Sequence, residues 1–297
     1  MFFFKYCIKF NKKKHILKSY ELINFLKLRD WIDINKIKWD WLSLNPNAIK
    51  LLKENKDKID WHGLSLNPNA ILLLKENKNK IDWTNLSYNE NAIELLKENK
   101  NKINWDYLCL NLNAIELLKE NENKINWRSL SANPNAINIL KKNKNKINWY
   151  YLSENPNAIN ILKKNPNKII WKHLSLKLNA IKLLKENKDK IDWKCLSANS
   201  NAISLLKKNQ TKINWNLLSL NTNAIELLKE NQDKINWHYF SSNPNIFTYD
   251  YKLMKENMKN LGIAEELMSV IFHPKNMNKW KDWGFSEHQD FIDFNNK

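Results

Sequence analysis

The six histidines are the residues whose chemistry can first be tested against their spacing: His15, His62, His173, His238, His273 and His288. None forms an HxxxH or HExxH pair or joins a cysteine cluster, which are the arrangements that hold metals. His62, His173 and His238 follow a tryptophan by one or two residues, at positions that vary along the chain, so we expect them on the surface. No GxGxxG or P-loop motif is present. We therefore expect no metal, cofactor, small-molecule substrate or enzymatic activity. An enzyme, as the alternative, would have its site in the tail around His273.

Serine and cysteine are the remaining candidate nucleophiles. A serine stands four residues after most tryptophans, as Ser65 follows Trp61, and Cys109 takes this place once. Because no reaction needs a nucleophile in every copy, these hydroxyls are interpreted as bonding local backbone. Cys7, Cys109 and Cys195 lie far apart without a CxxC motif, which favours a reducing compartment over a disulfide framework.

These residues recur because the chain repeats one short unit. Its consensus is W-x-x-L-S-x-N-x-N-A-I-x-L-L-K-E/K-N-x-x-K-I-D/N. Ten tryptophans mark the units at a spacing of 22 residues without insertion or deletion: Trp39, Trp61, Trp83, Trp105, Trp127, Trp149, Trp171, Trp193, Trp215 and Trp237. A fixed period of this kind is typical of a solenoid, in which each unit packs on its neighbours.

Each unit predicts two short helices. The Asp or Asn before the tryptophan can cap the first helix, except that Ile170 cannot. Asn67-Pro68 ends the first helix and opens the second, and Asn77 ends the second through left-handed backbone angles. A leucine-rich strand repeat is disfavoured because its L-x-x-L-x-L frame is absent. We expect an all-α, right- or left-handed α-solenoid of about ten two-helix repeats, a curved rod of roughly 80–100 Å with the tryptophans in its core.

The two ends differ from the repeat and predict divergent helical caps. Residues 1–38 form a basic N-terminal capping segment, with an amphipathic helix expected over 20–28. Residues 39–258 are the repeat array, whose tenth unit is degenerate. Residues 259–297 form a C-terminal tail, with a helix expected over 263–272.

The short N-terminal apolar stretch is a poor signal peptide because Lys5 and Lys9 interrupt it. No later segment approaches the ~18 uninterrupted apolar residues of a membrane span. We expect an intracellular chain that is not secreted and does not bind membranes.

The array resembles repeat proteins encoded by giant DNA viruses of the mimivirus type. The resemblance rests on LSLNPNAI at Leu42–Ile49 and Leu64–Ile71, on the ten copies of the unit, and less specifically on the tail from Glu265 to Gly284. It implies a viral origin, with the host cytoplasm or the virion as location. It carries over no activity and no functional residue.

Positive charge is concentrated in four of the ten units. The chain has a net charge of +18, and residues 127–214 hold 18 basic and 4 acidic residues. In this stretch Glu gives way to Lys at Lys142, Lys164 and Lys208. The variable positions after the tryptophans are Arg128, Tyr150, Tyr151, Lys172, His173 and Lys194. Such side chains suit anchors for a protein partner, and equally suit phosphate contact with base stacking.

Other columns are invariant. An asparagine recurs at Asn47, Asn69, Asn91, Asn113, Asn135, Asn157, Asn179, Asn201, Asn223 and Asn245. We interpret it as a hydrogen-bond ladder at the helix starts, the alternative being a groove that holds a peptide backbone. Two lysine columns, Lys53 to Lys229 and Lys58 to Lys234, are interpreted as a solvated face, and the codon bias of an AT-rich genome would also produce them.

We therefore expect a non-enzymatic scaffold that binds a viral or host protein through the variable positions after each tryptophan. The alternative is non-specific binding of nucleic acid or another polyanion by residues 127–214.

Overall fold

The computed structural model describes residues 25–260 and divides the chain into two units. The unit Leu28–Phe247 contains the repeats, and the other unit joins Met1–Lys27 to Thr248–Lys297. Strands β1 (Leu26–Leu28) and β2 (Phe247–Tyr249) pair in a two-stranded sheet, and helix α22 spans Tyr251–Asn260.

The expected helix over 20–28 is wrong where the structure describes it, because Leu26–Leu28 is a strand. The rest of that segment, the expected helix over 263–272 and the region around His273 lie outside the described residues.

Each unit begins with a short helix that starts at its tryptophan. These first-row helices are α3 (Trp39–Ser43), α5 (Trp61–Leu66), α7 (Trp83–Tyr88), α9 (Trp105–Leu108), α11 (Trp127–Ala132), α13 (Trp149–Leu152), α15 (Trp171–Ser175), α17 (Trp193–Leu196), α19 (Trp215–Leu218) and α21 (Trp237–Ser241). The capping prediction is confirmed. The Asp60 carboxylate accepts from the N–H of Gly63, its counterparts do the same, and Ile170 makes no side-chain cap.

A second helix follows in nine units, as the Ala-Ile-x-Leu-Leu stripe predicts. The second-row helices are α4 (Ile49–Glu54), α6 (Ile71–Glu76), α8 (Ile93–Glu98), α10 (Ile115–Lys119), α12 (Ile137–Lys142), α14 (Ile159–Lys163), α16 (Ile181–Glu186), α18 (Ile203–Lys207) and α20 (Ile225–Lys229). In several units a 3₁₀ turn leads into this helix, as Pro68–Ala70 leads into α6 with Asn67 as its cap. In the tenth unit the turn Pro244–Ile246 leads into β2 instead.

Asn77 ends α6, but its mechanism differs from the prediction. Its φ is −129°, outside the left-handed region, and its Nδ2 donates to the carbonyl of Leu73 at 2.9 Å. A third element follows, the 3₁₀ turn Lys78–Lys80, which the sequence did not predict. The same turn recurs at Lys56–Lys58, Lys100–Lys102, Glu122–Lys124, Lys144–Lys146, Pro166–Lys168, Lys188–Lys190, Gln210–Lys212 and Gln232–Lys234.

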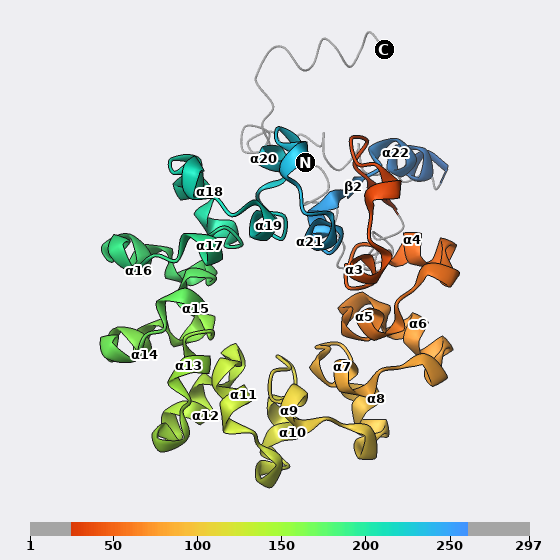
Figure 1. The fold of residues 1–297 in the computed structure, drawn as a ribbon. Coiled ribbons are helices and arrows are strands. Elements are labelled where there is room, and N and C mark those ends of the chain that lie inside the picture. The colour runs from red at the N-terminus through yellow and green to blue at the C-terminus, as the bar shows by residue number, and fades with distance from the viewer. Residues whose placement is uncertain (1–24, 261–297) are drawn as a thin grey trace, which may run out of the picture. The chain divides into compact units, whose positions relative to one another are not determined.

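The ten repeats within Leu28–Phe247 close into a ring, where the sequence led us to expect a curved rod. Helix α21 packs against α3, and Asn45 Nδ2 donates to the carbonyls of Ser241 and Asn243 at 3.0 and 2.9 Å. Figure 1 shows the first-row helices around the inside of this ring and the second-row helices around the outside. The all-α repeat architecture itself is as the sequence predicts.

The core lies between the two rows. Leu64 in α5 and Leu74 in α6 are both fully buried, and the same two leucine positions are buried around the ring. The expectation that each tryptophan is a core residue is wrong in degree, because all ten tryptophans are only half-buried. Each stands at the first residue of its helix, at the rim of the core that the leucines fill.

Candidate functional site

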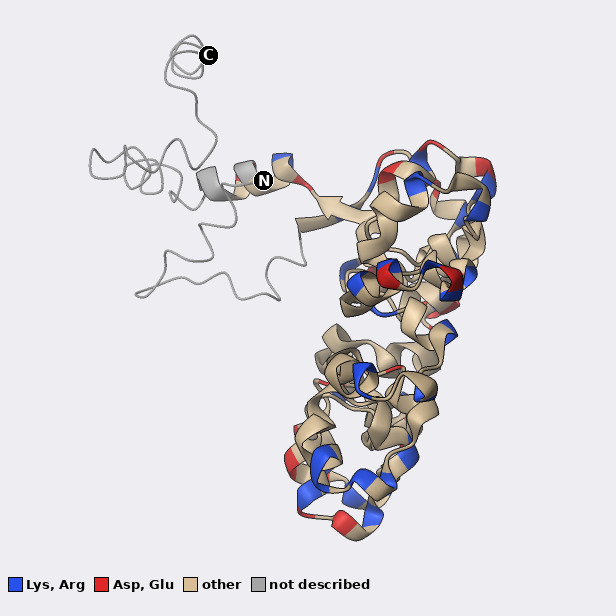
Figure 2. Ribbon diagram, turned by 90° about the vertical axis from the view of Figure 1, so that its left-hand side faces the viewer, with Lys and Arg blue, Asp and Glu red and all other residues tan. Residues whose placement is uncertain are grey.

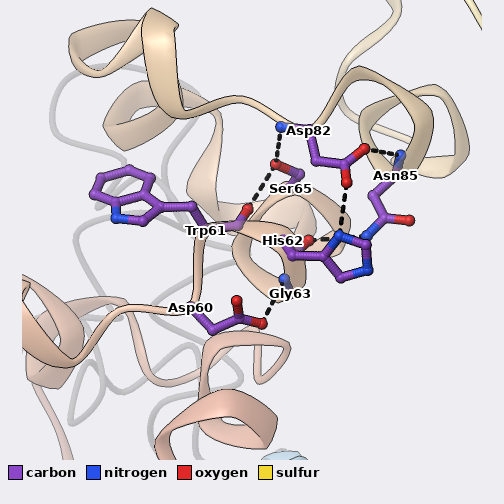
Figure 3. A network of polar contacts seen from close by, with 7 residues as sticks. All are labelled: Asp60, Trp61, His62, Gly63, Ser65, Asp82 and Asn85. Atoms are coloured by element: carbon purple, nitrogen blue, oxygen red, sulfur yellow. Dashed lines mark hydrogen bonds and ion pairs between the residues drawn. The ribbon is translucent and has the colours of Figure 1, made fainter.

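The repeated serine ties one unit to the next. Ser65 Oγ donates to the carbonyl of Trp61 at 2.8 Å and accepts at 3.0 Å from the N–H of Asp82, the cap that stands directly before the tryptophan of the following unit. Figure 3 shows this network, in which Asp82 also caps α7 through the N–H of Asn85. The interpretation of the serine as a structural hydroxyl is confirmed.

Two asparagines per unit complete the interface. Asn67 is fully buried, and its Nδ2 donates to the carbonyls of Ser43 and Asn45 in the preceding unit at 3.0 and 2.8 Å. Asn69, from the column noted in the sequence, donates to the carbonyl of Pro46 at 2.9 Å. These amides are therefore used between units, which confirms the hydrogen-bond ladder. From the sequence, Asn67 was expected only as a helix cap, and its bonds to the preceding unit were not foreseen.

The second lysine column covers the tryptophans. Lys80 Nζ lies 4.6 Å from the centre of the Trp61 ring, and the same pairing joins Lys58 to Trp39, Lys102 to Trp83, Lys146 to Trp127, Lys190 to Trp171, Lys212 to Trp193 and Lys234 to Trp215. An ammonium over an indole face is attracted by the ring quadrupole. This column is thus a structural contact, where the sequence suggested only a solvated face.

The variable position directly after each tryptophan is exposed in all ten units. It lies on the first-row helices, opposite their buried leucines. The first-row helices that carry this position form the inner row of the ring (Figure 1). The ten residues are Asp40, His62, Thr84, Asp106, Arg128, Tyr150, Lys172, Lys194, Asn216 and His238.

In units 2, 4 and 9 the variable residue pairs with the cap of the next unit. His62 Nδ1 lies 2.6 Å from Asp82 Oδ2, as Figure 3 shows, and Asn126 Nδ2 donates to Asp106 Oδ1 at 2.8 Å. Asn236 and Asn216 repeat the contact at 3.2 Å. Tyr150 cannot form this contact, because the cap position before the next tryptophan is Ile170, which has no polar side-chain atom.

The structure brings four of the predicted site residues together. The Arg128 guanidinium lies 4.8 Å from the centre of the Tyr151 ring, and the Tyr150 ring lies 5.2 Å from Tyr151 and 4.4 Å from His173. His173 Nδ1 lies 2.9 Å from Glu154 Oε1. This Arg128 cluster spans units 5, 6 and 7, and Tyr150 is 49% exposed within it.

The other predicted residues fall into two groups. Lys172 and Lys194 are exposed on the first row, and their side chains make no hydrogen bond or ion pair with the Arg128 cluster within residues 25–260. Lys142 ends α12, and Lys164 and Lys208 directly follow α14 and α18, so these exposed lysines lie on the outer row. The nine predicted residues therefore do not form one surface.

Nine of the ten interfaces between units contain the same four hydrogen bonds. At the ring closure, for example, the N–H of Lys38 donates to Ser241 Oγ at 2.9 Å, and Asn47 Nδ2 donates to the carbonyl of Pro244 at 2.9 Å, beside the two bonds of Asn45. The closure is thus built like the internal interfaces.

The exception is the interface between unit 6 (149–170) and unit 7 (171–192), here the 6/7 interface. Lys177 stands where the buried asparagine stands in the other units, so both of that asparagine's bonds are missing. Asn179 makes no bond to the carbonyl of Pro156 among the described residues. Among the described residues, the one bond of the four that remains joins the N–H of Ile170, the residue directly before Trp171, to Ser153 Oγ at 3.0 Å.

Lys177 is half-buried, and its side-chain amine makes no hydrogen bond or ion pair within the described part of the chain. Burial lowers the pKa of its amine, and the charge of Glu154 opposes that shift. Neither Lys177 nor Glu154 was expected from the sequence to be a site residue. A signal existed, because Lys177 is the single break in the column of first asparagines.

Figure 2 shows the charged residues on one side of the array, where Lys and Arg segments are more widespread than Asp and Glu segments. No group of three or more His, Cys, Asp or Glu residues between 25 and 260 is placed to hold a metal ion. Within the same range, no helix combines the length and apolar character that a membrane crossing requires.

Comparison of the chain with protein-family models, with curated proteins and with solved structures found no match.

Proposed function

We propose that the chain is a non-enzymatic scaffold that binds a protein partner through the variable first-row positions. The proposal rests on a difference between two sets of positions in each unit. The repeated Ser and Asn residues, and most of the repeated Trp and Lys residues, are engaged in contacts within the array, whereas the position after each tryptophan is exposed and changes from unit to unit. Recognition of one partner needs varied side chains, and these are the varied ones.

The residues proposed to contact the partner are the exposed Arg128, Tyr150, Lys172 and Lys194. Tyr151 and His173 are less exposed and contact Arg128 and Tyr150. Tyrosine and arginine are enriched among residues that dominate protein interfaces. The resemblance to giant-virus repeat proteins suggests that the partner is a viral or host protein inside the infected cell.

The test is affinity capture from the source cells, followed by binding of the purified partner. Alanine at Arg128, Tyr150, Lys172 and Lys194 removes only exposed side chains, so the array should remain folded. The matched control has alanine at His62, Thr84, Asp106 and Asn216, which occupy the same position in other units. We expect the first variant to lose the partner and the control to keep it. Retention by both variants would refute the proposal.

A second candidate, binding of nucleic acid or another polyanion, is favoured by the 18 basic against 4 acidic residues in 127–214. It predicts affinity that is independent of sequence and falls steeply with salt. Titration of single-stranded DNA at two salt concentrations tests it, and a flat salt dependence or no binding at low salt would exclude it.

A further inference from the structure

We infer that the 6/7 interface is a recognition site for an acidic protein segment, whose carboxylates are bound by Lys177 and by the Arg128 cluster beside it. The inference rests on the proposed function and adds to it a location and a chemical class of partner.

The 6/7 interface departs from the repeat in a way that the fold does not require. An asparagine at position 177 would make two bonds to the carbonyls of Ser153 and Asn155, as Asn155 does to Ser131 and Asn133 at 3.1 and 2.7 Å. The Lys177 side chain forms neither bond, and its amine makes no hydrogen bond or ion pair in their place among the described residues; the nearby charge of Glu154 acts on it without direct contact. Departures from a local rule without a structural gain are expected at functional sites.

The groups left unpaired here are donors. The Lys177 amine is half-buried and without a hydrogen bond, and the hydroxyl of the exposed Tyr150 makes none within residues 25–260. Arg128 adds a guanidinium held over the Tyr151 ring, with N–H groups that suit a carboxylate in a bidentate geometry. A ligand that satisfies these groups must supply anionic oxygens.

The same surroundings favour carboxylates of a protein over the phosphates of a nucleic acid. Glu154 pairs with His173 inside the cluster, with 31% of its side chain exposed, so a ligand must carry its negative charges at separate points that avoid this carboxylate. Most of the second lysine column is engaged with tryptophans, and Lys142 and Lys164 lie on the outer row, so the basic residues do not form one continuous track. A short segment with a few spaced carboxylates fits a localised site better.

The span of the site sets the length of the segment. Neighbouring packed helices lie about 8–10 Å apart. The distance from α11 to α15 is then about 20 Å, which an extended peptide covers with about six residues.

The experiment measures binding of a fluorescein-labelled peptide of about a dozen residues, alternating Glu and Ser, to the full chain by fluorescence anisotropy. The control peptide has Gln in place of Glu, and single-stranded DNA is titrated in parallel. The variant is Lys177→Asn, which restores the repeat consensus and should therefore fold at least as well as the parent. Lys53→Asn, an exposed lysine of unit 1, is the matched control for the change in charge.

We expect the acidic peptide to bind, the Gln peptide not to bind, K177N to weaken binding at least tenfold, and K53N to change it less than twofold. Absence of binding to the acidic peptide, equal binding by K177N, or tighter binding of DNA than of the peptide would each overturn the inference. If K177N binds normally while the four-alanine variant loses its captured partner, only the site and partner class fail. If that variant keeps its partner, the proposed function fails as well.

Discussion

At the scale of single residues, the few breaks in the repeated columns carry the most information. Cys109 replaces the serine in unit 4 and keeps one of its two bonds, since its Sγ accepts from the N–H of Asn126 at 3.3 Å. Lys177 replaces an asparagine and keeps neither bond. The first break keeps part of the bonding, whereas the second leaves a half-buried amine that makes no hydrogen bond or ion pair within residues 25–260.

Cys109→Ser should stabilise the array. Serine would donate to the carbonyl of Trp105 and accept from Asn126 with an oxygen, as Ser65 does in unit 2. One added hydrogen bond contributes about 1 kcal/mol to the free energy of unfolding. Chemical denaturation measures it, and Cys195→Ser, outside the serine column, is the control. A loss of stability would show that the larger sulfur is needed for packing.

Burial raises the pKa of Cys109 to about 11, so its thiol stays protonated at neutral pH. Because the thiolate is the nucleophile, alkylation of the folded chain at pH 8 should leave Cys109 unmodified. Mass spectrometry of peptides after brief iodoacetamide treatment checks this. Modification as fast as in denaturant would contradict the burial.

Lys177→Asn should raise the free energy of unfolding by about 2 kcal/mol near pH 7, because two hydrogen bonds are added. The difference should shrink as pH rises. Folding lowers the pKa of the Lys177 amine, so the unfolded chain binds the proton more tightly than the folded chain does. The free energy of unfolding of the wild type therefore rises with pH between the lowered pKa of the folded state and the ordinary lysine pKa. Denaturation of both proteins between pH 7 and 10 tests the sign. A difference that grows with pH would contradict it.

At the scale of the elements, the sequence predicts the helices within one 22-residue repeat far more completely than it predicts how the repeats pack on one another. Helix starts follow from Asp60 and its counterparts, and the second helix follows from the apolar stripe after Asn69. The 3₁₀ turn Lys78–Lys80 was not predicted, because its lysines were interpreted as part of a solvated face. The Arg128 cluster could be predicted as a set of variable residues, but its contacts depend on how three units pack.

The lysine that covers each tryptophan should stabilise its unit modestly. Lys80→Met removes the ammonium over Trp61 and should cost about 0.5–1 kcal/mol of unfolding free energy. Lys124→Met is the control, because no ammonium lies over Trp105 in the described part of the chain. Equal effects of the two substitutions, measured by denaturation, would show that the ring contact contributes nothing.

At the scale of the whole array, Leu28–Phe247, the closed ring is the feature that could not be predicted from the sequence. Small differences in rotation per unit decide whether a repeat array stays open or returns on itself. Closure gives unit 1 and unit 10 neighbours on both sides. It also leaves the 6/7 interface as the one place where the hydrogen-bond pattern is interrupted.

Hydrogen exchange followed by mass spectrometry tests the closed ring and its single weak interface together. Stability in a repeat array is local, so each interface reports its own opening. We predict that the amides of residues 38–47, at the closure, exchange as slowly as those of residues 60–69 and 82–91, and that residues 170–180 exchange first. Fast exchange of 38–47 together with slow exchange of 170–180 would contradict the account.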